Sequence, residues 1–184
     1  QEVILLEKNE KLGKKVYITG KGRCNLTNAC DMEKLMDSVC TNRKFLYSAF
    51  YGCTNQDVIN FFETHGMKTK TERGDRVFPL SDKSADVIDT LRDAMKKAGV
   101  RVHLHTEVES ILLEDAAEEG GEKKVLGIKL KNGTEIPADR VLVATGGLSY
   151  KTTGSTGDGY RFAESAGHKV TELSPSLVPF NTRE

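Results

Sequence analysis

Two short runs of apolar residues predict strands buried inside a parallel sheet. Residues 3–6 are all apolar and lead directly into Glu7. A second apolar run at 141–144 precedes a pair of glycines. Continuous apolar runs of this length are typical of strands that are covered on both faces. A third short strand is predicted at 16–18, inside a polar and basic stretch.

Residues 31–66 have mainly helical periodicity. Apolar residues three and four positions apart predict helices within 32–39 and 55–66, and the segment 42–52 favours another helix between them. That middle segment contains a cluster of aromatic residues, which we expect to pack in a helical core: Phe45, Tyr47, Phe50 and Tyr51.

Two further helices are predicted downstream. The clearer one covers 84–99, where Ser84 can cap the first turn and Gly99 can end the last. The other covers 158–168 and is closed by Gly167.

The remaining segments predict strands and hairpins. Residues 67–80 indicate two strands joined by a turn at 73–75, and 100–114 indicate a longer strand. The hydrophilic segment 115–124 is typical of a hairpin tip. Between 125 and 141, the Asn132-Gly133 pair predicts a tight hairpin.

The order of these elements indicates an α/β protein with a three-layer, Rossmann-like nucleotide-binding domain. A helical insertion and a small antiparallel β-meander interrupt it. We expect a partial Rossmann segment at 1–30, a mostly helical insertion at 31–80 and the rest of the domain at 81–173, with the meander at about 106–140. Residues 174–184 are interpreted as a linker toward a second domain.

Composition limits the classes of function. Lys and Arg number 27, as do Asp and Glu, so no overall field favours nucleic acid. There is no long apolar run, which argues against a membrane span, and no secretory signal precedes the first strand. None of the four cysteines forms a CxxC pair and no histidine pair completes a zinc set, so we expect a reduced, cytoplasmic protein without a metal.

Glycines are concentrated in the segment that follows the second apolar run. Five of them fall within fourteen residues, at a junction between a predicted strand and a predicted helix: Gly146, Gly147, Gly154, Gly157 and Gly159. Glycine lets a ligand approach the backbone closely, and a helix amino end favours an anion. The glycines could also serve only tight turns, but their number favours a ligand site.

The segment ITGKGRCNLTN at 18–28 is a second candidate for binding phosphate. It lacks the ending and spacing of a Walker A loop. Its two glycines expose backbone amides, and Arg23 and Asn25 add donors. Between residues 7 and 23, six basic residues and two acids leave an excess of four positive charges, which suits a diphosphate. On charge alone, a solvated basic loop fits equally well.

Four segments together resemble a bacterial flavoprotein family: GKKVYITGKGRCNLTN, RVFPLSDKSADV, VLVATGGLSYKTTGSTGDGYRFAESAGH and PSLVPF. Its members are NAD(P)/FAD-dependent oxidoreductases, including aminoacetone-oxidase-like proteins, and are related to fumarate reductase and L-aspartate oxidase. The resemblance covers nearly the whole chain. It implies that a complete member begins with a strand and a GxGxxG turn and continues into a second domain, neither of which is present here.

The resemblance also implies an FAD site. Glu7 matches the acid that binds the adenosine ribose, with Lys8 beside it, and the backbone of Val108 matches the group that binds the adenine edge. The loop around the diphosphate and toward the isoalloxazine matches Gly20, Gly22, Arg23, Cys24 and Asn25. A loop beside the FAD matches Thr145, Gly146 and Gly147, and a loop on the flavin side matches Gly157 and Asp158.

Other reactive residues have simpler interpretations. Cys24 could be redox active, but a small packed residue is the favoured interpretation, since no second cysteine is spaced to resolve it. His103 and His105 share a strand face without a third ligand, so a metal site is disfavoured. Asp75 and Asp82 are interpreted as turn residues.

The sequence therefore predicts the FAD-binding part of a flavin-dependent oxidoreductase. Hydride transfer would occur at flavin N5, on a small-molecule substrate of unknown identity, with NAD(P)H as a candidate redox partner. No residue is assigned as the catalytic acid or base, and neither nucleic acid nor membrane is an expected partner. The alternative is a cofactor-free α/β fragment or binding module, because the dinucleotide glycine loop is absent.

Overall fold

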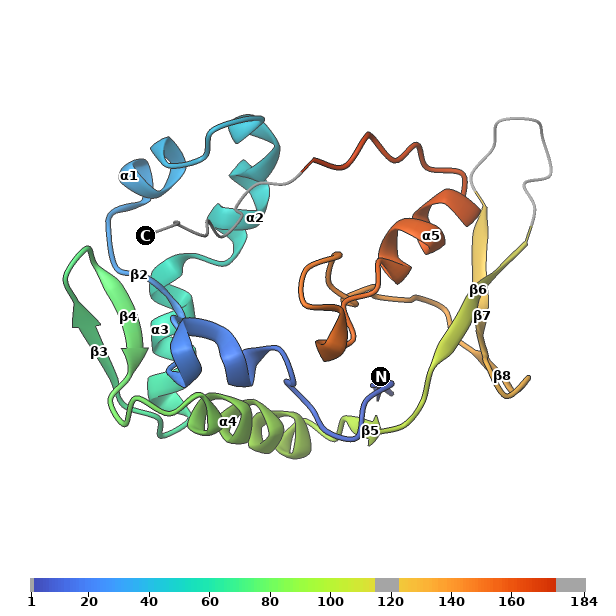
Figure 1. Cartoon of the computed structure of the whole chain (residues 1–184), viewed down its shortest axis with the longest axis horizontal. Helices are drawn as coiled ribbons and strands as arrows, with labels where there is room; N and C mark the ends of the chain where they lie inside the picture. The colour runs from blue at the N-terminus through green and yellow to red at the C-terminus, as the bar shows by residue number, and fades with distance from the viewer. Residues whose placement is uncertain (1, 115–122, 175–184) are drawn as a thin grey trace, which may run out of the picture. The chain divides into compact units, whose positions relative to one another are not determined.

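The computed structural model describes residues 2–114 and 123–174, which form two compact units, Gln1–Thr106 and Glu107–Glu184 (Figure 1). Most of the predicted hairpin tip and nearly all of the predicted linker lie outside the described residues.

A pair of parallel strands carries the Rossmann-like character of the first unit. Strand β1 (Ile4–Leu6) pairs with β5 (Arg101–His103), and Leu5 lies opposite Val102. This confirms the predicted strand and its parallel pairing. The residues of β1 are half-buried rather than fully covered.

Helices fill the predicted insertion and precede β5. Two of them begin at residues that cap them: Asp31 accepts from Lys34 N at 2.7 Å, and Thr54 and Asp57 form a reciprocal capping box. The helical elements between residues 31 and 97 are α1 (Met32–Asp37), the 3₁₀ turn η2 (Arg43–Leu46), α2 (Tyr47–Gly52), α3 (Asn55–Thr64) and α4 (Ser84–Lys97).

The start of α4 differs from the expectation. Lys83 occupies the capping position, and Ser84 is the first helical residue. The buried Ser84 hydroxyl instead donates to the backbone oxygen of Tyr17 at 3.2 Å. Helix α4 is thereby joined to the segment around Tyr17, beside which it lies (Figure 1).

A three-stranded antiparallel sheet completes the first unit. Its order is β2 (Thr27–Asn28), β4 (Arg76–Pro79), β3 (Thr69–Glu72), with the predicted turn at 73–75 confirmed between β3 and β4. Gly74 and Asp75 in that turn have left-handed backbones, with φ values of 78° and 59°. Glycine and Asp tolerate this conformation, which explains why the sequence signal was strong.

The strand predicted at 16–18 is wrong, because this segment is part of a 3₁₀ helix, η1 (Val16–Gly22). Its backbone amides bond locally: Tyr17 N donates to Gly13 O and Ile18 N to Lys15 O, each at 3.1 Å. Three apolar residues flanked by glycines satisfy their amides in turns when no neighbouring strand offers a ladder.

The core of the first unit lies between η1, α3 and α4. Its buried members are Cys24, Phe62, Met67 and Val87, with partly buried Val16, Leu26 and Val58 packed against them. Each fully buried apolar side chain of this size contributes about 1.5–3 kcal/mol. The aromatic cluster of the insertion does not join this core: Phe45 is 85% exposed, and Tyr47 and Tyr51 stack on each other at the surface. That prediction is wrong for these three rings, because the 3₁₀ turn η2 leaves Phe45 exposed and the short helix α2 leaves Tyr47 and Tyr51 exposed.

The second unit contains the predicted meander. Strands β6 (Val108–Glu114), β7 (Lys124–Leu130) and β8 (Glu135–Pro137) form an antiparallel sheet in that order. The Asn132-Gly133 hairpin joins β7 to β8, as expected, and Thr134 N donates to the Asn132 side chain at 3.0 Å. A 3₁₀ turn and a helix follow: η3 (Lys151–Thr153) and α5 (Asp158–Ser165).

Two strand predictions fail around this unit. The single strand expected at 100–114 is divided into β5 and β6, with left-handed His105 (φ 52°) between them. The apolar run at 141–144 forms no strand in the part of the chain that the structure describes, and Leu142 is 92% exposed. An apolar run becomes a buried strand only where neighbouring strands supply hydrogen bonds and cover.

Across residues 2–114 and 123–174, no helix has the length and apolar character that crossing a bilayer requires. All four cysteines are thiols rather than disulfides.

A substitution at Gly127 of β7 tests the pairing of β7 with β8. A Cβ at this position would lie 2.2 Å from Ile136 O and 2.9 Å from Pro137 Cα, both in the backbone of β8. We expect Gly127→Ala to lower the free energy of unfolding by about 1–3 kcal/mol, measured by thermal and urea denaturation. The matched control is Gly52→Ala, where a Cβ meets nothing within 4 Å; equal stability of the two variants would contradict the close approach of β7 and β8.

Candidate nucleotide-binding site

Glu7 follows the carboxyl end of β1, where parallel sheets present ligand-binding groups. Both its backbone N–H and its backbone C=O are hydrogen-bonded to the segment that contains and follows β5. Glu7 N donates to His103 O at 2.9 Å, and Thr106 N donates to Glu7 O at 2.9 Å. The carboxylate therefore projects from a hydrogen-bonded strand end rather than from a loose loop.

Asn9 orients the Glu7 carboxylate. Glu7 Oε1 accepts from Asn9 N at 2.8 Å and from Asn9 Nδ2 at 2.7 Å. Asn9 O in turn accepts from His105 N at 3.1 Å, so the turn that follows β1 is attached to the chain beyond β5. Sequence reasoning did not identify Asn9. The available signal was an amide side chain two residues after a strand-terminal acid, a spacing that suits local turns.

Residues 20–24, here called the GKGRC loop, have an unusual backbone. Four of the five residues are left-handed: Gly20 (φ 54°), Lys21 (φ 56°), Gly22 (φ 85°) and Cys24 (φ 59°). Two local bonds brace the loop, from Arg23 N to Gly20 O at 3.2 Å and from Cys24 N to Thr19 O at 3.1 Å. Left-handed backbones at Lys21 and Cys24 are strained, and such strain is concentrated at ligand sites.

The two glycines of the GKGRC loop differ in what surrounds them. A Cβ at Gly20 would lie 3.2 Å from Asn25 N and 3.5 Å from the Phe78 ring, so the protein itself fills that space. A Cβ at Gly22 would meet only Tyr17 O, at 3.8 Å. The backbone at Gly22 is therefore the place where a ligand can approach this loop closely.

Arg23 is engaged by two carboxylates. Its Nε donates to Asp82 Oδ1 at 2.7 Å, its terminal nitrogen donates to Glu72 Oε1, and its guanidinium lies 4.1 Å from the centroid of the Phe78 ring. The hydrogen bond that Arg23 donates to Glu72, followed by the one it donates to Asp82, raises the pKa of Arg23 above its ordinary value. Two carboxylates therefore occupy part of the Arg23 fork in this structure, and its predicted place in the diphosphate loop stays a prediction.

Lys70 closes the same group of charges. Its Nζ lies 2.6 Å from Asp82 Oδ2 and 3.4 Å from Glu72 Oε1. Two cations and two anions thus form a neutral set, the Arg23 network: Arg23, Lys70, Glu72 and Asp82. Sequence reasoning missed it and interpreted Asp82 as a turn residue; Asp82 does have a left-handed φ of 58°, but its carboxylate is an ion-pair partner.

The last two predicted residues of this loop have structural contacts. Cys24 is 8% exposed and belongs to the core, which fits the interpretation as a packed residue. The Asn25 amide, oriented so that its nitrogen faces two carbonyl oxygens, donates to Thr27 O at 3.0 Å and Val77 O at 3.1 Å. Its donors are therefore used within the protein.

The glycine-rich segment of the second unit folds back on itself. Gly157 N donates to Gly147 O at 3.1 Å, and Gly146 and Gly157 are left-handed. A Cβ would lie 2.8 Å from Ser155 Oγ at Gly146 and 2.7 Å from Leu148 Cδ2 at Gly157. Both positions suit glycine because their left-handed backbones are ones that other residues rarely adopt, which fits the tight-turn interpretation of the sequence.

The other predicted residues of this unit lie at its element ends. Asp158 opens α5, accepts from Thr156 Oγ1 at 2.9 Å and lies 3.4 Å from Arg161. Thr145 lies close to α5, since a Cβ at Gly159 would be 3.2 Å from its hydroxyl. Val108 begins β6. The structure thus groups the predicted residues into a strand end with Glu7 and Lys8, the GKGRC loop, and a set in the second unit.

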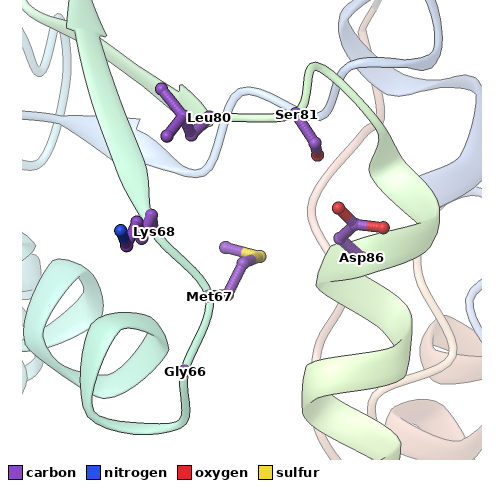
Figure 2. A pocket seen from close by; sticks show the side chains of 6 residues that line it. All are labelled: Gly66, Met67, Lys68, Leu80, Ser81 and Asp86. Atoms are coloured by element: carbon purple, nitrogen blue, oxygen red, sulfur yellow. The ribbon is translucent and has the colours of Figure 1, made fainter.

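A hollow of about 310 Å³ lies elsewhere in the first unit, between the chain that follows α3 and the start of α4 (Figure 2). None of the predicted cofactor residues lines it; its lining is Gly66, Met67, Lys68, Leu80, Ser81 and Asp86. Within the described ranges, no group of three His, Cys, Asp or Glu side chains could hold a metal ion.

The parallel strand pair and its terminal acid define a Rossmann-like α/β domain of the nucleotide-binding class. A family model described as the HI0933-like protein Rossmann domain matches residues 1–180, and the chain belongs to that family. The fold is shared with the crystal structure of Thermovibrio ammonificans THI4, with a TM-score of 0.54 at 16% identity over 91% of this chain and 54% of that one.

Curated relatives are similar along the whole chain. A 3-dehydro-bile acid delta(4,6)-reductase of Clostridium scindens is 33% identical over 191 residues, and a ribosomal RNA dihydrouridine synthase of Escherichia coli is 31% identical over 181. These alignments cover 100% and 98% of this chain but 42% of each relative. The chain therefore spans less than half the length of these relatives, and neither of the two is named as an aminoacetone oxidase.

The Arg23 network gives a prediction about acid. The hydrogen bond from Arg23 lowers the pKa of Glu72 below its ordinary value of 4.5. The hydrogen bond from Lys70, followed by that from Arg23, lowers the pKa of Asp82 below its ordinary value of 3.8. A carboxylate whose pKa is lower in the folded than in the unfolded protein stabilises the fold fully at pH values above its unfolded-state pKa. That contribution is lost as the pH falls through its folded-state pKa.

We therefore expect the double variant Glu72→Gln/Asp82→Asn to be less stable than the wild type at about pH 7, and the difference to shrink toward about pH 3. Urea denaturation across this range measures it. A difference in stability that stays constant with pH would contradict the network.

Proposed function

We propose that this chain is the FAD-binding part of a flavin-dependent reductase. The observation that carries the proposal is the Glu7 carboxylate, held at the carboxyl end of a parallel strand by main-chain bonds and oriented by Asn9. A carboxylate at that place can accept hydrogen bonds from both hydroxyls of a ribose. This was the role that the family resemblance implied.

The GKGRC loop supports the same proposal with a different division of labour. Gly22 leaves space for a diphosphate to approach the backbone, and exposed Lys21 makes no ion pair among the described residues. Arg23 is neutralised by its carboxylates. We therefore assign the anion contact in this loop to the Gly22 backbone and Lys21, with Lys8 beside Glu7 as a further cation.

The second unit contributes the remaining predicted contacts. Thr145, Gly147 and the Val108 backbone are assigned to the cofactor by the resemblance. A Cβ at Gly147 would have one close neighbour, Tyr160 Oη at 3.4 Å, so this glycine has more open space than Gly146 or Gly157. Gly147 is the glycine of its loop whose missing side chain best suits a ligand.

The names of the relatives favour a reductase over an oxidase. One acts on a bile acid and the other forms dihydrouridine in ribosomal RNA, and both names describe reductions. A bound flavin supplies hydride transfer through N5, and NAD(P)H is the proposed reductant. With 27 basic and 27 acidic residues and all cysteines as thiols, we propose a small-molecule substrate and a cytoplasmic location.

The competing proposal is an α/β module that binds no cofactor. This proposal is favoured by Gly146 and Gly157, whose left-handed backbones give them a role in the loop's own turns. It is also favoured by Arg23, whose guanidinium already pairs with two carboxylates. The visible absorption spectrum of the purified protein separates the two proposals. Visible flavin absorption bands that remain through gel filtration support the flavoprotein, whereas a colourless protein that takes up no added FAD supports the module.

Glu7→Gln tests the ribose contact. The amide keeps an oxygen for Asn9 but loses the negative charge and one acceptor, so the dissociation constant for FAD should rise about tenfold. Glu10→Gln is the matched control, because Glu10 is a nearby acid whose carboxylate forms an ion pair with Lys14 at 3.1 Å. Unchanged FAD affinity in Glu7→Gln, by fluorescence titration, would remove Glu7 from the site.

Anaerobic titration of the flavin with NADH and NADPH tests the reductant. We expect one of the two to bleach the flavin absorbance stoichiometrically, since a reductase must be recharged by a hydride donor. Failure of both, with dithionite still reducing the flavin, would rule out NAD(P)H as the redox partner.

A further inference from the structure

The backbone of the GKGRC loop needs a constraint beyond its own hydrogen bonds. Lys21 and Cys24 carry side chains yet have φ values of 56° and 59°. Non-glycine residues persist in this conformation only where the surrounding structure holds them there. The Cys24 side chain is held by the core, but Lys21 is exposed.

Arg23 is the residue through which the rest of the unit reaches this loop. Its partners lie 49 and 59 residues further along the chain, Glu72 at the end of β3 and Asp82 after β4. The guanidinium also lies over Phe78 of β4, a ring that is 4% exposed. A planar, five-donor group thus connects the loop to both strands of the β3–β4 hairpin.

The partners of Arg23 are themselves held in place. Lys70 lies on β3, two residues before Glu72, and pairs with both carboxylates; Asp82 is a left-handed residue whose amide donates to Pro79 O at 3.0 Å. The Arg23 network therefore connects strand β3, the GKGRC loop and the turn after β4, and is more than a single pair of surface charges.

We propose that Glu72 and Asp82 are positioning residues that hold the GKGRC loop, through Arg23, in its cofactor-binding conformation before the cofactor arrives. This inference rests on the proposed function for the identity of the ligand. Neither carboxylate contacts the cofactor; each restricts Arg23, and Arg23 fixes the backbone at Gly22. A loop ordered in advance binds its ligand without the entropy cost of ordering it.

A positioning role and a purely stabilising role have different consequences. The side chains of the network are 29–42% exposed, and ion pairs of this kind contribute little to global stability. Removing one carboxylate should therefore change the loop's order and ligand affinity far more than it changes the melting temperature.

Hydrogen exchange in the absence of cofactor tests the loop directly. In Glu72→Gln and Asp82→Asn, the Arg23 and Cys24 amides should exchange about tenfold faster than in the wild type, because the loop opens more often. Asp37→Asn is the matched control: it removes a surface partner of another arginine, Arg43, at 2.5 Å. Unchanged exchange in both network variants would overturn the proposal.

An FAD titration tests the functional consequence. We expect Glu72→Gln to raise the dissociation constant about tenfold with a near-normal melting temperature, and Arg23→Lys, which keeps the charge but not the fork, to do the same. The double variant Arg23→Lys/Glu72→Gln should bind FAD no more weakly than either single variant, because both substitutions break the same interaction. Additive losses, or wild-type affinity in Glu72→Gln, would overturn the positioning role.

The two levels of the account fail separately. If the wild type binds no FAD, the proposed function is wrong and the loop is not a cofactor loop. The exchange experiment then still decides whether Glu72 and Asp82 hold the loop in place.

Discussion

The conformation of the GKGRC loop depends on the attachment of Arg23 to Glu72 and Asp82. Without it, a strained stretch of left-handed residues would be fixed only by two local hydrogen bonds and the burial of Cys24. The attachment joins three parts of the first unit that are distant in sequence: the loop, the end of β3 and the residue after β4. It also cancels the charge of Arg23, which leaves the Gly22 backbone and Lys21 as the groups suited to an anion.

Local patterns predicted the elements whose causes are local. The α4 helix, the turn at 73–75 and the Asn132-Gly133 hairpin follow from periodicity and turn chemistry, and the structure confirms them. The failures at 16–18 and 141–144 have another cause. Whether a short apolar run becomes a strand depends on a neighbouring strand, and the sequence of the run does not contain that information.

The candidate site shows the same division. Glu7 could be found from sequence because a strand-terminal acid is a local pattern, whereas the partners of Arg23 are remote and could not be read from its surroundings. Glycine counts were also ambiguous. At Gly146 and Gly157 a Cβ would lie within 3.0 Å of a neighbouring side chain, whereas Gly22 and Gly147 have more space for a ligand. The family resemblance predicts FAD as the cofactor, and the contacts in the structure indicate which residues are available to bind it.

A crystal structure of the protein with FAD tests the central claim most directly. The account predicts that the Glu7 carboxylate bonds the hydroxyls of the adenosine ribose, that the diphosphate lies against Gly22, and that Arg23 stays on Glu72 and Asp82. A structure in which Arg23 leaves its carboxylates to bind the diphosphate, or in which the ribose lies away from Glu7, would contradict it.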